Sequence, residues 1–569
     1  MGSEAGDLSL KNLVVIYDNH LFSMINFNDF LELLPLTALY AETHYRFRFF
    51  PFSRYFRREA EVVFDTPIRL EPGVSLPVSL IIKDSKKFPL RIINVHLQAT
   101  SKGVTSEEKI PLNTDISSSF WHRIFNLDIS SLPDGEVAVE ATAEVSDGRH
   151  TWTVQQDNHP LLSHAPFNVY KSADPMPAFP EWSAGELHCH SEFGFDQVEF
   201  GAPLEVYQKS APSMGIDWVA ITDHSYNLDD MPDDYLTDDP MLRKWKNFLE
   251  KVETLNQTRV GALLIPGEEL TCRSALGKNI HLLVLDNLEF LHGTGDGAQK
   301  WLHTRSENSV AEALSKITDS AFTAAAHPLV PINWLQRLLV RRGRWEDQDL
   351  RQDKLMGWQI CNGMWDKGFY SGLKKWIEEI NRGKRVYIFA GNDAHGNFNR
   401  FRQIKIPMWT MHENQDHLFG KVTTRVRSRG RVRKNEIIEN MKDGKSYISD
   451  GPAIELSIIQ NNKILFSGDT ADSNSTGSVR VRYKSSPEFG QLHFLKILGD
   501  DQNRESLIRQ YTPESDPFCK SFKGEILLPL TGSKYIRAEI ETENSNGKRY
   551  KAFTNPIWIS DVVSTHKLV

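Results

Sequence analysis

Residues 185–192 read GELHCHSE, a short strand-like segment that carries two histidines near its end. On an extended strand, His188 and His190 are two positions apart and therefore share one face, with Cys189 on the other. Two imidazoles on one face can hold one divalent cation. This segment therefore predicts a strand and, at its end, one side of a metal site.

Later segments repeat the pattern of an apolar run that carries metal-competent side chains. These side chains are Asp223 and His224 in WVAITDHS, Glu268 and Glu269 in LLIPGEELT, His281 in NIHLLVL, His327 in AAAHPLV, and Asp393 and His395 in VYIFAGNDAHG. Apart from His281, each lies at or beside the C-terminal end of its strand. In α/β barrels active sites are built at that end of the strands. A shared position for all these motifs predicts one common site.

Helix-like patterns separate many of these segments. Strands are expected at Gly185–His190, Asp217–Thr222, Ala262–Leu270, Ile280–Leu285, Phe322–Ala326, Gly357–Cys361 and Val386–Ala390, and helices at Pro203–Met214, Met241–Leu255, Val310–Ile317 and Gly372–Ile380. Strand–helix alternation predicts an α/β region with a parallel sheet, either a barrel or doubly wound. Asn308 or Ser309 is expected to cap the third helix and Ser371 the fourth.

The regions before and after this α/β region have a different sequence pattern. Short alternating runs such as SLPVSLIIKD and EVAVEATAEVSD precede the α/β region, and AIELSII and SVRVRYK follow it. Such runs, separated by turn signals, are typical of β-sandwiches. We therefore expect an N-terminal β-sandwich region with a linker at 1–180, the α/β region at 181–450, and a C-terminal β-sandwich at 451–569.

The net charge, the number of cysteines and the lengths of the apolar runs argue against several classes of function. The formal net charge is -8, which argues against a general nucleic-acid binder. The basic run from Arg425 to Lys434 is interpreted as a solvated loop and helix start, with an anion-binding patch as the alternative. Four cysteines do not make a disulfide scaffold, and neither a signal-peptide pattern nor a membrane-length apolar run is visible. A cytoplasmic protein with no membrane partner is expected, and its oligomeric state is open.

The ligand types point to metal chemistry. Imidazoles and carboxylates without paired thiolates suit Zn, Mn or Fe. The candidates outnumber the three or four ligands that one cation needs, so two to three divalent transition metals are expected, and Glu269 could bridge two of them. Such a cluster lowers the pKa of bound water towards about 7. No Walker A loop, dinucleotide-binding GxGxxG or GxSxG nucleophile elbow offers a competing chemistry.

The series HxH, TDH, PGxE, a following His, AHP and a terminal G-x-D-A-H resembles the polymerase and histidinol phosphatase (PHP) family, over roughly half of the chain. The exit segment GKSYISDGP resembles the carbaryl-hydrolase-like branch, whose members often carry extra β-domains. The resemblance implies a distorted (β/α)7 TIM-like barrel flanked by β-sandwich-like domains.

The resemblance also implies a role for each matched residue. His188, His190 and Asp393 would ligate a first metal, Glu269 would bridge, and His281 and His327 would complete a second metal. Asp196, His224 and His395 would serve a third metal or acid–base catalysis, and Asp223 would orient a neighbour. Two positions depart from the family pattern: Gln359 stands where an acid is usual, which favours two metals over three, and Asn392 replaces a serine.

The function expected from these motifs is that of a metal-dependent hydrolase, most of all a phosphoesterase for mono- or diesters, acting on a small molecule. A carboxyl- or carbamate-ester hydrolase on the same centre is the first alternative, and a non-catalytic, metal-stabilised binding scaffold the second. Positive side chains that could hold a phosphate are Arg273, Lys278, Arg400 and Arg402.

Overall fold

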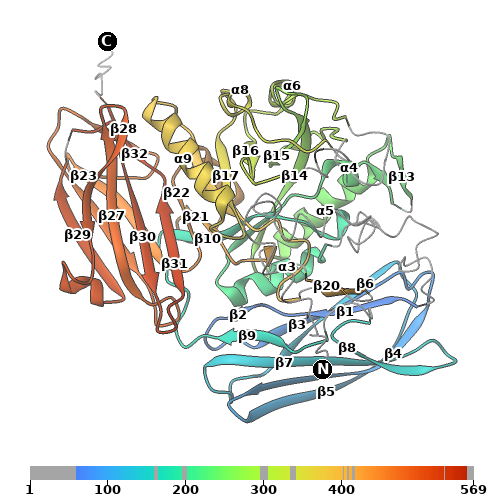
Figure 1. Cartoon of the computed structure of the whole chain (residues 1–569). Coiled ribbons are helices and arrows are strands. Elements are labelled where there is room, and N and C mark those ends of the chain that lie inside the picture. The colour runs from blue at the N-terminus through green and yellow to red at the C-terminus, as the bar shows by residue number, and fades with distance from the viewer. Residues whose placement is uncertain are drawn as a thin grey trace, which may run out of the picture.

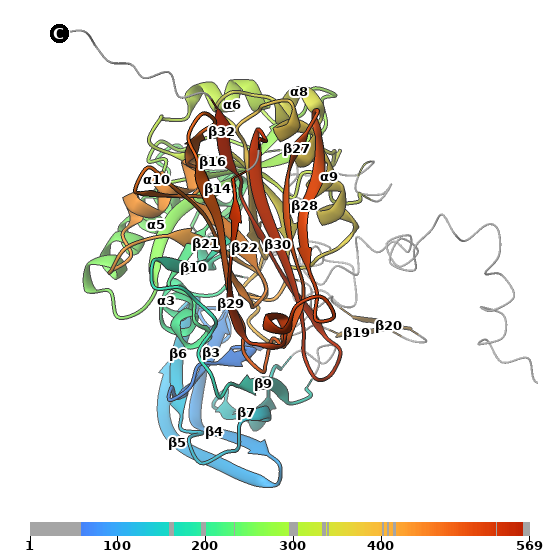
Figure 2. The same ribbon diagram turned by 90° about the vertical axis from the view of Figure 1, so that its left-hand side faces the viewer.

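The structure is a computed structural model. It describes residues 59–158, 164–194, 201–232, 234–294, 305–332, 337, 341–400, 403–406, 409–412, 417–530 and 532–560. An N-terminal pair of sheets lies at the bottom of Figure 1, a sheet-rich C-terminal region at its left, and the region between them in sequence lies above the first and to the right of the second. In Figure 2 the C-terminal strands β27, β28 and β30 face the viewer and the N-terminal sheets lie below.

The N-terminal region is a sandwich of two sheets. Its first sheet is antiparallel, with β1 (Glu61–Asp65), β3 (Leu76–Lys83) and β6 (Phe120–Leu127). The second runs in the order β2 (Arg69–Leu70), β9 (Phe167–Lys171), β7 (Gly135–Ser146), β4 (Leu90–Ser101) and β5 (Val104–Ile116), and β8 (Thr151–Gln155) pairs with β7. Alternate residues of β7, such as Val137, Val139 and Ala141, are buried between the sheets because successive strand side chains face opposite ways.

The site region is built on a mixed sheet. β10 (Trp182–Cys189), β11 (Trp218–Ile221) and β14 (Leu263–Arg273) are parallel neighbours. β14 then turns back as an antiparallel hairpin with β15 (Asn279–Leu285), which also pairs antiparallel with β16 (Phe322–Ala326). β17 (Gly357–Asn362) and β18 (Tyr387–Gly391) continue parallel to β16. On its other edge β10 pairs antiparallel with β21 (Thr423–Arg427), which pairs with β22 (Ser446–Ser449).

The expected (β/α)7 TIM-like barrel, and with it the fold implied by the family resemblance, is wrong for this chain. The individual strands lie close to their predicted ranges, but they do not form a parallel, helix-wrapped barrel. No helix separates β14 from β15 in the described chain, so these strands form a hairpin, and strand residues far outnumber helical ones throughout. The same sheet continues through β22 into the C-terminal strands, in a 15-stranded sheet.

The C-terminal region shares that sheet. β22 pairs with β31 (Arg549–Thr554), followed by β30 (Tyr535–Glu543), β27 (Gln491–Asp501) and β28 (Arg504–Tyr511), with β25 (Thr470–Asp472) and β32 (Ile557–Ser560) off this path. A second sheet, in the order β24 (Lys463–Phe466), β23 (Ala453–Gln460), β26 (Gly477–Lys484) and β29 (Lys523–Pro529), contributes with it to a common apolar core.

Helices cover only part of the site region. The longer ones are α3 (Leu204–Ser210), α5 (Arg243–Thr258), α6 (Val310–Lys316), α9 (Lys367–Asn381) and α10 (Lys434–Lys442), and the shorter turns are η5 (Glu192–Gly194), η6 (Ala211–Met214), α4 (Ser225–Leu228) and α8 (Asp347–Leu350). Ser309 caps α6 through a capping box with Glu312. The cap of α9 is Asp366, and Ser371 lies inside that helix.

Two small hairpins, β12 (Asp230–Met231) with β13 (Asp234–Asp238) and β19 (Gln403–Ile406) with β20 (Trp409–His412), and the turn η8 (Pro517–Lys520) complete the described elements. Within the described ranges, no helix is both long enough and apolar enough to cross a membrane. The basic run begins in β21, where Arg425 is buried, and ends at the start of α10. All four cysteines are buried and unpaired.

Candidate metal centre

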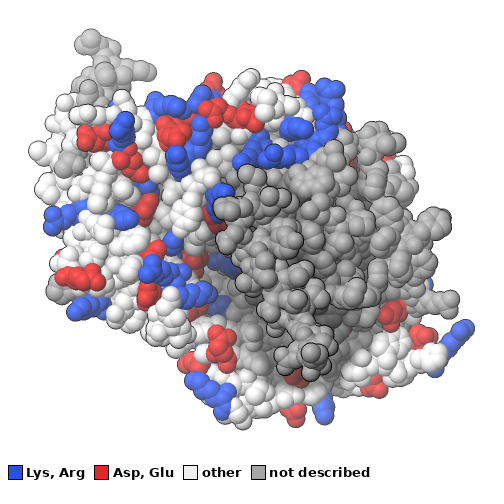
Figure 3. All heavy atoms as spheres, viewed as in Figure 1, with Lys and Arg blue, Asp and Glu red and all other residues white. Residues whose placement is uncertain are grey.

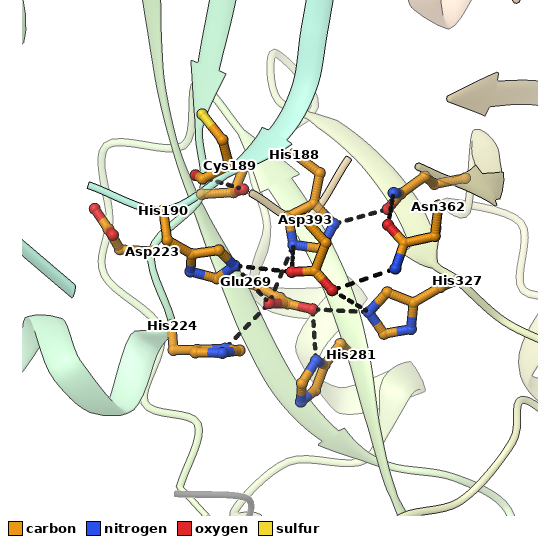
Figure 4. Close-up of polar contacts among 12 residues, drawn as sticks. His188, Cys189, His190, Asp223, His224, Glu269, His281, His327, Asn362 and Asp393 are labelled. Carbon is orange, nitrogen blue, oxygen red and sulfur yellow. Dashed lines mark hydrogen bonds and ion pairs between the residues drawn. The ribbon is translucent and has the colours of Figure 1, made fainter. Parts of the chain in front are cut away.

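Side chains from separate strands meet at one end of the curved sheet (Figure 4). His188 lies near the end of β10 and His190 just beyond it, and both are buried. The backbone N–H groups of His190 and Asp393 donate to the carbonyls of Ala394 and His188, at 2.9 and 2.8 Å. These bonds tie the segment after β18 to the end of β10. Residues more than 200 positions apart in sequence are thereby held on one side of a common site.

Glu269 is the centre of the arrangement. Its Oε2 lies 3.2 Å from His188 Nε2 and 3.1 Å from His224 Nδ1. Its Oε1 lies 2.5 Å from His281 Nδ1 and 3.3 Å from His327 Nε2. His190 Nε2 also lies 3.5 Å from Oε2. One carboxylate, itself on β14, therefore faces five imidazoles from four different parts of the chain. A carboxylate placed in this way can bridge two cations.

Asp393 closes the other side. Its Oδ1 lies 3.1 Å from His190 Nε2 and 3.3 Å from His188 Nε2. His395, two residues later, stacks on His190 with ring centroids 4.1 Å apart. His395 Nδ1 lies 3.0 Å from the carbonyl oxygen of Asp393, which can only accept, so the proton of a neutral His395 is on Nδ1.

Ligand-type atoms within 4.8 Å of one another form three overlapping groups at this site. They are His188, His190, Glu269 and Asp393; His224, Glu269 and His281; and His190, His224 and His395. Among the described residues His327 belongs to none of these groups, although its Nε2 approaches both Glu269 and Asp393. The predicted partner of His281 at a second cation was His327, whereas the geometry pairs His281 with His224. Asp196 lies outside the described residues.

The charges in the site favour a bound cation. Burial lowers the pKa of His224 to about 3 and that of His327 to about 4, so both are neutral near pH 7 and offer lone pairs. Burial also acts to lower the pKa of His188, but the charges of Glu269 and Asp393 outweigh it and raise the value to about 10. The two carboxylates thus hold a positive charge at His188, as a proton or as a metal ion in its place.

Two further observations fit the residues to metal ions. His188 Nε2 and Glu269 Oε2 are fully buried, and in the part of the chain that the structure describes their contacts, such as the 3.2 Å one between them, are ion-pair contacts without hydrogen-bond geometry. Buried polar atoms are almost always hydrogen-bonded, so atoms left over in this way mark an interaction of another kind. In addition, Asp393 and His327 have left-handed backbones, with φ of 54° and 30°. A non-glycine residue in this conformation costs free energy, and outside turns such residues cluster at sites that bind ligands or carry catalysis.

Neighbouring acids support the ligands without joining any of these groups. Asp223 accepts from the backbone N–H and the hydroxyl of Ser191, both at 2.6 Å. Glu268 accepts from the Ser225 hydroxyl at 2.9 Å, and burial raises its pKa to about 8. Glu269 is therefore the acid of its pair that faces the histidines, and Glu268 points to the other side of the strand.

Two groups at this site were not predicted from the sequence. Glu186, fully buried, accepts from the backbone N–H groups of His188 and Asn392, at 3.0 and 2.9 Å, and from the Asn392 side chain. Its position two residues before His188, on the same strand face, was the available signal. Asn392, which stands where the motif resemblance implied a serine, is thus explained as the hydrogen-bond partner of Glu186.

The second missed group is Arg342, whose Nη1 lies 2.5 Å from His281 Nε2. Nothing in the sequence pattern links it to His281. Of the predicted phosphate-binding residues, Lys278 lies against Gly343, beside Arg342. Arg273 donates to the carbonyls of Ser306 and Glu307 and to the Glu312 carboxylate. Arg400 is buried beside Asp65, and Arg402 lies outside the described residues.

Comparison with known proteins adds little. No protein-family model and no curated protein matches the chain. Among solved structures, one assigned as a beta-galactosidase from Bacteroides fragilis is 10% identical, with a TM-score of 0.17 over 88% of this chain and 73% of its own. A beta-glucuronidase from Parabacteroides merdae is 8% identical, with a TM-score of 0.18 over 89% and 64%. These likenesses establish neither a fold nor an activity for this chain.

Proposed function

We propose that the chain is a metal-dependent hydrolase of ester bonds, and specifically a phosphoesterase. The observation that carries the proposal is the convergence of the buried Glu269 carboxylate with five imidazoles and with Asp393 at one site. The order of the motifs, which resembles that of the PHP family, supports the chemistry, although the fold expected from that resemblance is wrong.

The chain's own residues provide places for at least two cations. His188, His190, Glu269 and Asp393 would hold one, and His224 and His281 would hold a second, with Glu269 common to both. Divalent ions bound there would supply Lewis acidity, which acidifies water and neutralises charge on an ester oxygen. Two carboxylates in the first group offset the charge of one divalent ion, so its site is close to neutral.

His395 is the residue best placed to move a proton. With Nδ1 held by the Asp393 carbonyl, its Nε2 is the basic nitrogen, and its ring is only partly buried. Stacking on His190 fixes the plane of the ring. An imidazole with one nitrogen fixed and the other basic is suited to general acid–base work. His395 would therefore take a proton from water or give one to a leaving alcohol.

Arg342 favours an anionic ester over a neutral one. Its guanidinium lies at the edge of the cluster, in contact with His281, and contributes to lowering the pKa of His327. Lys278 packs its Cβ and Cγ against Gly343, the residue that follows Arg342 in sequence. In Figure 3, Lys and Arg side chains gather along the upper right of the molecule. Guanidinium groups bind phosphate oxygens in pairs, whereas a carbamate offers no such charge.

A substrate panel tests the proposal. Purified protein, loaded in turn with Zn, Mn and Fe, is given an aryl phosphate, a bis-aryl phosphate, an aryl acetate and an aryl carbamate. We expect two or more metal equivalents per chain and turnover of the phosphates. Glu269→Gln should lose metal and at least 100-fold in kcat, since it removes the shared ligand. Glu250→Gln, an exposed acid on α5, is the matched control.

The outcomes separate the alternatives. Turnover of the acetate or carbamate without the phosphates would assign the carbon-ester reaction to the same centre. Metal binding without any turnover would favour the binding scaffold. Protein that takes up no metal after replete preparation would overturn the metalloenzyme proposal altogether.

A further inference from the structure

Gln359 stands in this chain where an acid was expected, and its side chain links two of the candidate ligands. It lies on β17 and is fully buried. Its Oε1 lies 2.8 Å from His188 Nδ1, and its Nε2 lies 3.0 Å from Asn362 Oδ1. Asn362 Nδ2 in turn lies 3.3 Å from Asp393 Oδ2. An unbroken line of polar contacts therefore runs from His188 to Asp393 (Figure 4).

The carboxylate at one end fixes the direction of every hydrogen bond in this line. Asp393 can only accept, so Asn362 must present its NH2 group to it and its oxygen to Gln359. Gln359 must then donate its NH2 group to Asn362 and turn its oxygen to His188. His188 is left to donate, which places its proton on Nδ1 and its lone pair on Nε2.

We propose that Gln359 and Asn362 form an amide relay that positions His188 and Asp393 for a shared metal ion. The relay holds the outer atoms, His188 Nδ1 and Asp393 Oδ2. The inner atoms, His188 Nε2 and Asp393 Oδ1, are left 3.3 Å apart and facing the cation site. This inference rests on the proposed metal centre, and it assigns Gln359 as a positioning residue where sequence analysis counted a missing ligand.

Glutamine is the only acidic or amide side chain of this length that can serve here. A glutamate would accept from His188 but would also face the Asn362 oxygen, so two acceptors would meet. It would also add a third negative charge beside Glu269 and Asp393. The neighbouring backbone is shaped for the relay: a Cβ on Gly391 would lie 3.0 Å from Gln359 Nε2 and 2.7 Å from the His188 Cβ. Glycine at 391 therefore lets all three strands approach.

The test measures metal affinity and does not depend on turnover. Apo protein of each variant is titrated with Zn²⁺ and Co²⁺, with the Co²⁺ electronic spectrum as a second readout. Removal of such an outer partner lowers metal affinity about 10–100-fold. We expect that loss for one of the bound ions in Gln359→Leu, with a changed Co²⁺ spectrum. Gln359→Glu should fail to restore affinity, although it keeps the shape and adds charge.

A double variant distinguishes the relay from a loss of packing. Asn362→Ala should also lower the affinity for the metal ion. The double variant Gln359→Leu with Asn362→Ala should bind the ion no more weakly than the worse single variant, because either change breaks the same line of hydrogen bonds. Gln460→Leu is the matched control. Gln460 is a buried glutamine in β23 that donates to the carbonyls of Asp472 and Ser475, far from the site in the C-terminal sheets.

The inference is overturned if folded Gln359→Leu binds both ions within twofold of the wild-type affinity. It is also overturned if the losses of binding free energy in the two single variants add up in the double variant. Should Gln359→Leu fail to fold, Asn362→Ala and Gln359→Glu carry the same test. Wild-type protein that binds ions but hydrolyses no ester would remove the proposed function and leave the relay to be judged on affinity alone.

Discussion

A carboxylate from the N-terminal sandwich binds the segment that follows His395. Removal of that carboxylate should lower the stability of the protein by an amount that the structure allows to be worked out. Asp65, at the end of β1, is buried. It accepts from the backbone N–H of Phe398 at 2.7 Å, and from those of Asn399 and Arg400 at 2.9 Å each. Asp65→Ala would leave these three buried donors, and the backbone N–H of Thr66 that also donates to Asp65 at 2.8 Å, without that partner. We expect it to destabilise the protein and to loosen His395.

The magnitude follows from two opposing effects. A buried donor left unpaired costs about 1–3 kcal/mol. Burial, however, raises the pKa of Asp65, so the ionised carboxylate is itself partly destabilised in the fold and its removal recovers some free energy. We therefore take the low end of that range for each of the four donors, which gives a loss of about 4 kcal/mol in total. Asp65→Asn keeps one acceptor and should lose about 1–2 kcal/mol.

Urea unfolding of metal-loaded protein measures these losses, with metal content as a second readout. Asp115→Asn, which breaks an exposed pair with Arg91 in the same sandwich, should be indistinguishable from wild type. A loss below about 1 kcal/mol in Asp65→Ala would refute the reasoning, since even one unpaired buried donor exceeds it.

The raised pKa of Asp65 also predicts that the free energy of unfolding depends on pH. Because the folded pKa of Asp65 is raised, its stabilising contribution is complete below the ordinary value of about 3.9 and is lost as the pH rises through the folded value. Asp65→Asn lacks this titration. The difference in unfolding free energy between wild type and Asp65→Asn should therefore shrink as the pH rises from below about 3.9 towards neutral, and a difference that grows would contradict the sign.

Three further predictions follow from the site and its surroundings. A chelator should lower the free energy of unfolding by about 4 kcal/mol relative to protein held at a thousandfold excess of metal over Kd, measured by thermal or urea unfolding. Arg342→Ala should raise KM for aryl phosphates about 10–100-fold, the equivalent of one charge-assisted bond, and leave neutral esters unchanged in steady-state assays. Ser309→Ala, which removes the cap of α6, should cost about 1 kcal/mol in urea unfolding without changing metal content.

The sequence predicted the strands of the site region well because each is an apolar run bounded by turn or charge signals. Phe322–Ala326 was predicted at its observed bounds, and β14, β15 and β18 lie within a few residues of theirs. Strand direction was not predictable in this way. A short connection after β14 favours a hairpin, but the apolar pattern of a buried strand is the same in parallel and antiparallel sheets.

The sequence by itself determined the chemistry of this protein: which residue types are present, and that they recur at strand ends where they can meet. Only the tertiary structure decided how they are used. It paired His281 with His224, gave Gln359 the contacts that link His188 to Asn362, and brought Arg342 to His281 from a segment that shares no motif with the site. It also placed Asp65 of the N-terminal sandwich against the backbone of residues 398–400. The physical reason is the distance along the chain over which each kind of interaction acts. Strand patterns depend on residues a few positions apart, whereas these contacts join segments up to 335 positions apart.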